Sequence, residues 1–336
     1  MHSAADRGGG ELARFRRLVN VTIVATFVLV VIGGIVRVSD SGLGCGPAGS
    51  GTHGWPLCEG RVLPFLEANA VIEFSHRAVA GVVGILIVIL VWHALRRLGE
   101  HRWLVRGSVV AAILVLAQAL LGGLTVENNL HEVLVAAHLG LAMLLLGVLI
   151  ALRRATFEGS GAVARPTGVL RPLAVTAVVL LLATIVAGGY MAGTEEEGVP
   201  GSSAAGAHLA CGTEFPTCLG EWMPFGLGEM VDVHLTHRLL MYLAAIAIVA
   251  MVAVARRRGV RSPAFPLALL LLACQILLGA LNVWLGEHAE LVVAHLTLGT
   301  LLWSTVVYAA MDLVAVPELG RASLRPAETE ASASPA

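Results

Sequence analysis

Eight apolar stretches, each long enough to cross a membrane as a helix, dominate this sequence. They lie near residues 15–37, 70–96, 103–126, 131–153, 170–192, 232–256, 263–286 and 290–314. A helix rises ~1.5 Å per residue, so about 20 apolar residues span a hydrocarbon core of about 30 Å. With 57% hydrophobic and 13% charged residues, the chain is too apolar for a soluble domain. The prediction is an all-α integral membrane protein with eight transmembrane helices.

Arginine predicts the orientation of these helices. All 22 basic residues are arginine, and an even number of spans places both termini on one side of the membrane. That side holds 18 of the arginines, so the positive-inside rule makes it cytoplasmic. We expect a multi-pass protein of a bacterial cell membrane with both termini in the cytoplasm. No basic patch interleaved with aromatic residues suggests a nucleic-acid partner.

The helices divide into two halves of four. The segment Gln118–Val126 reappears as Gln275–Val283, displaced along the chain by as many residues as His138 is from His295. We therefore predict two pseudo-symmetric four-helix bundles, residues 14–153 and 170–314, related by an axis along the membrane normal. A cytoplasmic connector at 154–169 separates them. The polar segments 1–13 and 315–336 are expected to be cytoplasmic tails that bury too little surface to fold.

Four histidines occupy matched depths near the outer ends of the second, fourth, sixth and eighth stretches. They are His76, His138, His237 and His295. Histidine inside a membrane costs free energy unless it faces the bundle interior with a partner. Imidazole suits iron, and two histidines on facing helices can fill both axial positions of a haem. The pattern predicts a membrane protein with two haem sites.

Charged neighbours distinguish the two halves. The clusters Glu73-Phe74-Ser75-His76-Arg77 and His234-Leu235-Thr236-His237-Arg238 align with Glu73 opposite His234. Glu73 shares a helix face with His76, so it is either a proton-handling catalytic group or an acid at the outer interface. Arg77 and Arg238 either bind haem propionates or extend to the membrane surface.

Each long outer loop carries a cysteine pair. On the extracytoplasmic side, oxidising chemistry favours one disulfide per loop. Zinc sites that include His53 and His208, or redox-active dithiols, are the alternatives. Cys274, inside a helix, is expected to be a small packing residue. The pairs are Cys45 with Cys58, and Cys211 with Cys218.

Taken together, these motifs resemble the haem A synthase family. The resemblance covers nearly the whole chain and implies eight helices in two halves. It also implies an activity: oxidation of a methyl group on haem O to a formyl group through hydroxylated intermediates, with a haem b cofactor. The motifs are Gly33-Gly34-Ile35-Val36-Arg37, Ser41-Gly42-Leu43-Gly44-Cys45, Trp55-Pro56-Leu57-Cys58, Glu73-x-x-His76-Arg77, Gln118 with Gly122-Gly123, His138-Leu139-Gly140, and their second-half counterparts.

The resemblance implies roles for individual residues. Glu73, His76 and His138 would form the haem O site, and His237 and His295 would ligate the iron of haem b. The Cys45–Cys58 pair would lie over the substrate site, although residues 46–57 resemble an insertion relative to 212–217. The implied partners are haem O, a haem O synthase that makes it, membrane lipid, and an electron donor or acceptor.

Two other functions are alternatives to this one. A two-haem cytochrome that only passes electrons would need the same four histidines, but it gives no reason for the difference between Glu73 and His234. A transporter is disfavoured because no helix shows paired Gly/Pro breaks in mid-membrane. The doublets Gly33-Gly34, Gly122-Gly123 and Gly188-Gly189 are interpreted as sites of close helix packing.

Overall fold

Eight long helices make up the architecture of the computed structural model, which describes residues 4–64, 66–157, 168–194, 206–286 and 288–314. They are α1 (Ala4–Val38), α2 (Ala68–Arg97), α3 (Arg102–Glu127), α4 (Glu132–Ala155), α5 (Leu170–Gly193), α6 (Glu229–Arg257), α7 (Ala264–Trp284) and α8 (Ala289–Met311), with a short 3₁₀ helix at Gly51–His53. All eight contain stretches long and apolar enough to cross a membrane. The predicted all-α membrane protein is confirmed, and the described residues contain no strand beyond isolated bridges.

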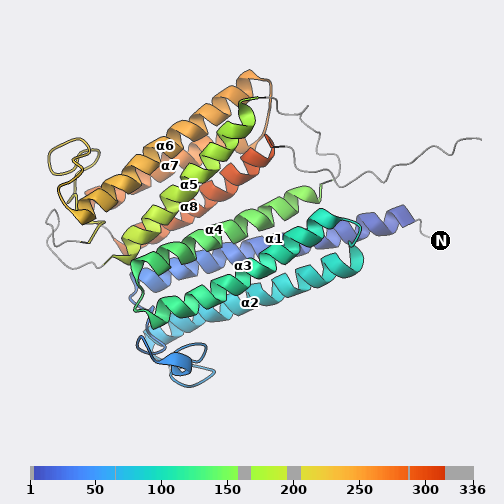
Figure 1. Ribbon diagram of the computed structural model, residues 1–336, viewed down its shortest axis with the longest axis horizontal. Coiled ribbons are helices and arrows are strands. Elements are labelled where there is room, and N and C mark those ends of the chain that lie inside the picture. The colour runs from blue at the N-terminus through green and yellow to red at the C-terminus, as the bar shows by residue number, and fades with distance from the viewer. Residues whose placement is uncertain (1–3, 65, 158–167, 195–205, 287, 315–336) are drawn as a thin grey trace, which may run out of the picture.

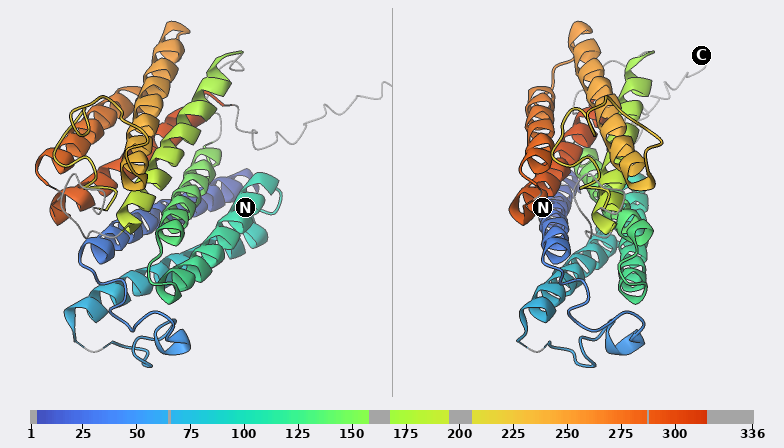
Figure 2. Two further views of the ribbon diagram at one scale, coloured as in Figure 1. Left: turned by 60° about the vertical axis from the view of Figure 1, so that its left-hand side comes forward. Right: turned by 90° about the vertical axis from the view of Figure 1, so that its left-hand side faces the viewer.

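The helices form two groups that lie side by side (Figure 1). Within α1–α4 and within α5–α8, each helix packs on the next, and the first packs on the fourth. The groups meet through α4 with α5, α1 with α8, and α4 with α8. Both long loops, described at 39–64 and 206–228, lie at one end of the molecule, whereas α1 begins and α8 ends at the other (Figures 1 and 2). Symmetry between the halves stays a prediction.

Helix α1 begins earlier than expected. Residues 4–13 belong to the helix, so the prediction of an unstructured 1–13 tail is wrong for its described part. Leu12 is buried in an apolar cluster with Phe15, and Glu11 pairs with Arg14 one turn away and with His93 of α2. These contacts with other helices stabilise a segment whose polar composition alone predicts no fold. Most of the 154–169 connector and the 315–336 tail lie outside the described residues.

Helix ends follow local chemistry. After α6, Gly259 adopts a positive φ of 77°, and the next N–H, of Val260, donates to the carbonyl of Ala255 at 3.0 Å. A left-handed residue at this position satisfies carbonyls that the last helical turn leaves free, and glycine adopts that conformation without strain. The sharp stop lets α7 return directly along the membrane.

Close apolar packing is concentrated toward the end of the molecule where the chain begins. One cluster fills the interior of the first group and includes Ile87, Leu90 and Leu149; the other joins α4 to the second group. On α2, Ala70 is buried beside the first disulfide, and the next buried apolar residue is Val83, two turns beyond His76. The histidines therefore occupy the loop-proximal part of each bundle. By contrast, Cys274 is exposed on α7, so its predicted packing role is wrong.

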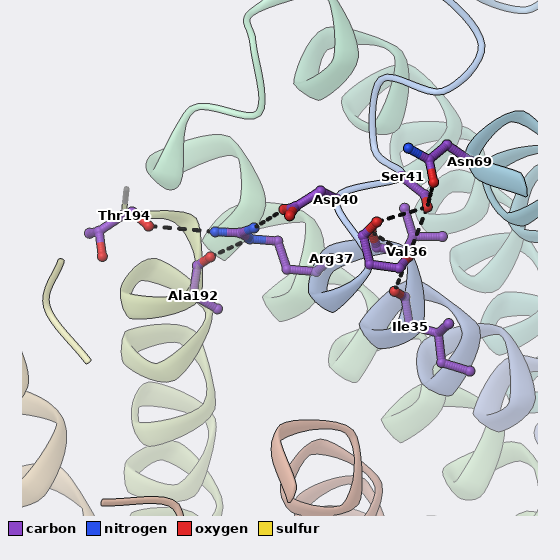
Figure 3. A network of polar contacts seen from close by, with 9 residues as sticks. Ile35, Val36, Arg37, Asp40, Ser41, Asn69, Ala192 and Thr194 are labelled. Atoms are coloured by element: carbon purple, nitrogen blue, oxygen red, sulfur yellow. Dashed lines mark hydrogen bonds and ion pairs between the residues drawn. The ribbon is translucent and has the colours of Figure 1, made fainter. Parts of the chain in front are cut away.

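Polar contacts hold the two groups together at different depths. Within the apolar interior, the buried indole of Trp303 on α8 donates to the carbonyl of Met143 on α4 at 2.9 Å. At the loop end, the guanidinium of Arg37 on α1 donates to the carbonyls of Ala192 and Thr194 at the end of α5 (Figure 3). These bonds fix the relative placement of helices that carry residues of both halves.

Candidate functional site

The four predicted histidines form two pairs. His76 on α2 lies within electrostatic range of His138 on α4, and His295 on α8 lies within range of His237 on α6. All four side chains are half-buried. The structure thus brings together one pair in each group of helices, at the depth where the packed apolar core gives way to the loop-proximal part of the bundle.

The ring nitrogens show how these histidines are held. Nδ1 of His237 lies 3.0 Å from the carbonyl oxygen of Thr184 on α5. A carbonyl can only accept, so Nδ1 carries the proton and Nε2 keeps its lone pair for a metal. Nδ1 of His138 and Nδ1 of His295 are buried without a hydrogen-bond partner, whereas the imidazole of His76 interacts with the backbone of Leu29 on α1.

These residues fit a haem better than a bare metal ion. Paired neutral imidazoles supply the two axial ligands that a low-spin haem takes. Among the described residues, no group of three or more His, Cys, Asp or Glu side chains is placed to hold a metal ion, whereas a bare transition-metal site usually needs a third ligand. The chemistry of the donor set therefore suits an iron that brings its own equatorial ligands.

Gln275 is a polar neighbour of this site whose contact the sequence did not predict. Its side-chain amide nitrogen donates to the backbone carbonyl of His295 at 3.1 Å and lies 3.2 Å from Nε2 of the same residue. The amide thus fixes the start of α8 against α7. The repeated Gln118 and Gln275 segments were the available signal, but no spacing rule predicted which atom the amide would reach.

Glu73 connects α2 to the first long loop. Its side chain is 4% exposed. One carboxylate oxygen accepts from the N–H of Cys45 at 2.7 Å, and the other accepts from the guanidinium of Arg77 one turn along the helix. A buried carboxylate with these two donors ties the helix, the loop and the first disulfide into one unit.

Arg77 and Arg238 both hold the loop above their own helix. Arg77 donates to the carbonyls of Gly54 at 2.6 Å and Leu57 at 2.8 Å. Arg238, 3% exposed, donates to three carbonyls of the second loop at 2.7 to 3.4 Å. Neither extends freely to the membrane surface. Their guanidiniums instead organise the backbone over each pair of histidines.

The second half replaces Glu73 by a neutral contact. His234 is buried, and its Nδ1 donates to the carbonyl of Ala207 at 2.8 Å. Among the described residues, no carboxylate forms an ion pair with Arg238, and backbone carbonyls accept from its guanidinium instead. The position of Glu73 is thus held by a carboxylate in the first half and by an imidazole in the second, although Asp232 of α6 also accepts from the N–H of Gly226 in the second loop at 2.7 Å.

Both predicted disulfides are present, Cys45–Cys58 and Cys211–Cys218. All four of these cysteines are buried. Each second cysteine begins a tight turn in which it exchanges two backbone hydrogen bonds with the residue three positions later, Arg61 or Glu221. The extra length at 46–57 therefore leaves this turn intact. Since their sulfurs are bonded in pairs, the zinc alternative does not apply to these cysteines.

The first loop reaches across to α3. A Cβ built on Gly123 would lie only 2.9 Å from the indole of Trp55, so the bare backbone of α3 gives this side chain room to lie over it. In the second loop, Phe215 packs edge-on against Trp284 at the end of α7. The indole N–H of Trp284 also donates to the carbonyl of Phe215 at 3.2 Å. Each loop covers its bundle with an aromatic residue.

Comparison with known proteins identifies the family. The COX15-CtaA model, described as cytochrome oxidase assembly protein, matches residues 16–307. The chain belongs to the haem A synthase family. It is 29% identical over 309 residues to a heme A synthase of Shouchella clausii, covering 88% of this chain and 96% of the relative. It is 30% identical over 305 residues to that of Halalkalibacterium halodurans, covering 87% and 95%. With that of Symbiobacterium thermophilum it shares 32% identity over 278 residues, covering 79% and 84%.

Membership of the haem A synthase family agrees with the architecture and with the site. The matched region runs from α1 into α8 and so includes both histidine pairs and both disulfide-bonded loops. The protein is a multi-pass membrane enzyme, a haem-dependent oxidoreductase. The expectation drawn from the sequence motifs is confirmed at the level of family and enzyme class.

Proposed function

We propose that this protein oxidises the methyl group of haem O to the formyl group of haem A, through hydroxylated intermediates. The observation that carries the proposal is the two histidine pairs, one in each four-helix group, in a chain of this family. One pair serves the substrate and the other a resident cofactor. The formyl group requires two successive rounds of oxidation at one carbon, so the substrate has to stay fixed between them.

The second-half pair is proposed to hold haem b. His237 and His295 would hold its iron, and the bond from His237 to the carbonyl of Thr184 at 3.0 Å supports Nε2 as the nitrogen that would bind it. The Gln275 amide lies 3.2 Å from Nε2 of His295, so it would have to give up this contact if that nitrogen held the iron. When bound, haem b supplies one-electron redox chemistry. The protein residues hold it in place and set its surroundings.

The first-half pair is proposed to hold haem O. His76 and His138 bind the substrate iron, and Trp55 covers the outer side of the bundle from its position on Gly123. Glu73 is proposed as the catalytic group, since the second half has no carboxylate at the equivalent position. It accepts a proton released during oxidation of the methyl, and the N–H of Cys45 and the guanidinium of Arg77 orient its oxygens.

The loop arginines are proposed to contact propionates with the donors that the loop carbonyls leave free. Nε of Arg238 is buried without a partner, which supports this role in the second half. The proposal has four further parts. The two halves divide at 154–169, and both termini lie in the cytoplasm of a bacterial cell. A haem O synthase supplies the substrate, and an external partner exchanges electrons with the enzyme. The arginine distribution supports the orientation.

Haem extraction tests the activity. Cells that make haem O are grown with and without this chain, and extracted haems are separated by reverse-phase chromatography with mass detection. We expect haem A or its hydroxylated precursor only when the chain is present. Haem O left unchanged, with haem b bound to the purified protein, would refute the oxidase and favour an electron-transfer cytochrome.

A histidine variant tests the cofactor assignment. His237→Ala is expected to lose haem b from the purified protein, because one axial ligand is removed. His93→Ala provides the control, since His93 contacts Glu11 on α1 near the opposite end of the molecule. Haem b stoichiometry equal to wild type in His237→Ala would remove the assignment.

A further inference from the structure

Each of the four histidines packs on a glycine of the preceding helix. The pairs are Gly33 with His76, Gly122 with His138, Gly188 with His237, and Gly279 with His295. The odd-numbered helix of each hairpin supplies the glycine and the even-numbered helix supplies the histidine. One contact thus recurs in all four helical hairpins of the chain.

The geometry of this contact is the same each time. A Cβ built on the glycine would lie 3.0 to 3.1 Å from Cε1 of the imidazole, 3.5 to 3.8 Å from Nδ1 and 3.9 to 4.0 Å from Nε2. The same three ring atoms come nearest in the same order in every pair. Four rings on four different helices therefore adopt one orientation relative to their glycine.

Only glycine permits this approach. Carbon atoms in contact prefer a separation of about 3.5–4.0 Å, so a methyl group at 3.0 to 3.1 Å would displace the ring by a few tenths of an ångström. Glycine lowers the stability of a helix interior relative to alanine. At these four positions the close approach of the imidazole explains why glycine is present despite that loss. Other helical glycines differ: a Cβ on Gly81 or Gly84 would meet no atom within 4 Å.

The adjacent glycines have other partners. A Cβ on Gly34 would meet Leu296 at 2.6 Å, and one on Gly189 would meet Leu139 at 3.1 Å. These leucines directly follow His295 and His138 in the sequence. In the Gly33-Gly34 and Gly188-Gly189 doublets, one glycine thus contacts a histidine of its own half and the other contacts the opposite half, whereas Gly123 meets Trp55 of its own half. The sequence interpretation as general close packing did not separate these contacts.

We propose that Gly33, Gly122, Gly188 and Gly279 are positioning residues that set the plane and depth of the four haem-ligating imidazoles. This inference rests on the proposed function, in which these histidines bind haem iron. Axial-ligand orientation and the groups behind the ligands tune a haem site. The glycines therefore act through the histidines and touch no reacting atom themselves.

The second-half site offers the sharpest test, because its haem is resident. Full-length wild type, Gly188→Ala and Gly279→Ala are purified in detergent, with Gly81→Ala as the matched control. Haem b content, the g-values of the ferric haem by electron paramagnetic resonance and the haem midpoint potential are measured. Mutating the groups behind a metal ligand typically weakens metal binding ~10–100-fold, and the added methyl would press on the imidazole. We expect shifted g-values and weaker haem retention of that order in both variants, and wild-type behaviour in Gly81→Ala.

The outcomes separate this inference from the proposed function. If Gly188→Ala and Gly279→Ala bind haem b with the g-values and retention of wild type, the positioning role is wrong, and the ligand assignment is unaffected. A wild-type protein without haem b would overturn the ligand assignment and, with it, this inference. Size-exclusion chromatography identifies variants that do not fold. Two variants on different helices of one site are used so that loss of one to misfolding leaves the other to decide.

Discussion

Replacing Glu73 separates its part in holding the first loop from its part in chemistry. In Glu73→Ala, the N–H of Cys45 loses its acceptor at 2.7 Å and the half-buried Arg77 loses its carboxylate. Breaking a buried ion pair from one side costs about 3–5 kcal/mol. Arg77 keeps the carbonyls of Gly54 and Leu57, so we expect a cost near the lower end, about 3 kcal/mol. At about 1.4 kcal/mol per factor of ten, local opening of the loop becomes ~100-fold more frequent.

Glu73→Gln keeps the shape and removes the charge. Its amide oxygen still accepts from Cys45, so the loop is weakened less than in Glu73→Ala, by about 1.5 kcal/mol, the lower end of the range for one charge-assisted hydrogen bond. Conversion of haem O should nevertheless be lost in both variants, because neither an amide nor a methyl side chain can take up the proton.

Two measurements distinguish these effects. Hydrogen exchange followed by mass spectrometry reports opening of the loop around Cys45, and haem extraction reports conversion. Glu67→Gln serves as control, since Glu67 is exposed at the start of α2 and its side chain makes no capping bond. Wild-type conversion by Glu73→Gln at normal haem content would refute the proton role. Unchanged exchange in Glu73→Ala would refute the hydrogen-bond argument.

Two further predictions concern the second loop and the contact between the halves. Arg238→Lys cannot reproduce three bonds to loop carbonyls at 2.7 to 3.4 Å, so residues 206–228 should exchange about tenfold or more faster, a loss of about 1.5–3 kcal/mol; exchange at the wild-type rate would contradict this. Trp303→Phe removes the bond to Met143 and leaves a void in the apolar interior, which should lower stability by about 1–3 kcal/mol in thermal unfolding. Trp92→Phe, on a largely exposed side chain, is the control, and equal melting temperatures for both variants would contradict the prediction.

The candidate site was predictable from the sequence in its residue types and not in its contacts. Their matched depth identified His76, His138, His237 and His295, because a histidine inside a membrane helix costs free energy unless it has a binding partner. The sequence did not predict that Cys274 is exposed on α7. A small apolar residue costs little free energy on either face of a membrane helix, so its position in the helix does not show which way it faces. The functions of the four histidines remain predictions.

What the sequence by itself determined is the set of membrane spans, the chain order of the two halves and the pairing of cysteines within each loop. These depend on hydropathy, length and neighbours close along the chain, so local composition is sufficient. The start of α1 escaped this reasoning because Leu12 is buried against residues of other helices.

Only the tertiary structure decided which atoms meet. The carboxylate of Glu73 reaches Cys45, Arg77 reaches the loop carbonyls, and four imidazoles lie against four glycines. These contacts join residues far apart in the sequence. They depend on how each helix is rotated and tilted, which the packing of all eight helices sets together. Hydropathy alone cannot specify that rotation, because the lipid-facing and interior faces of these helices are both apolar.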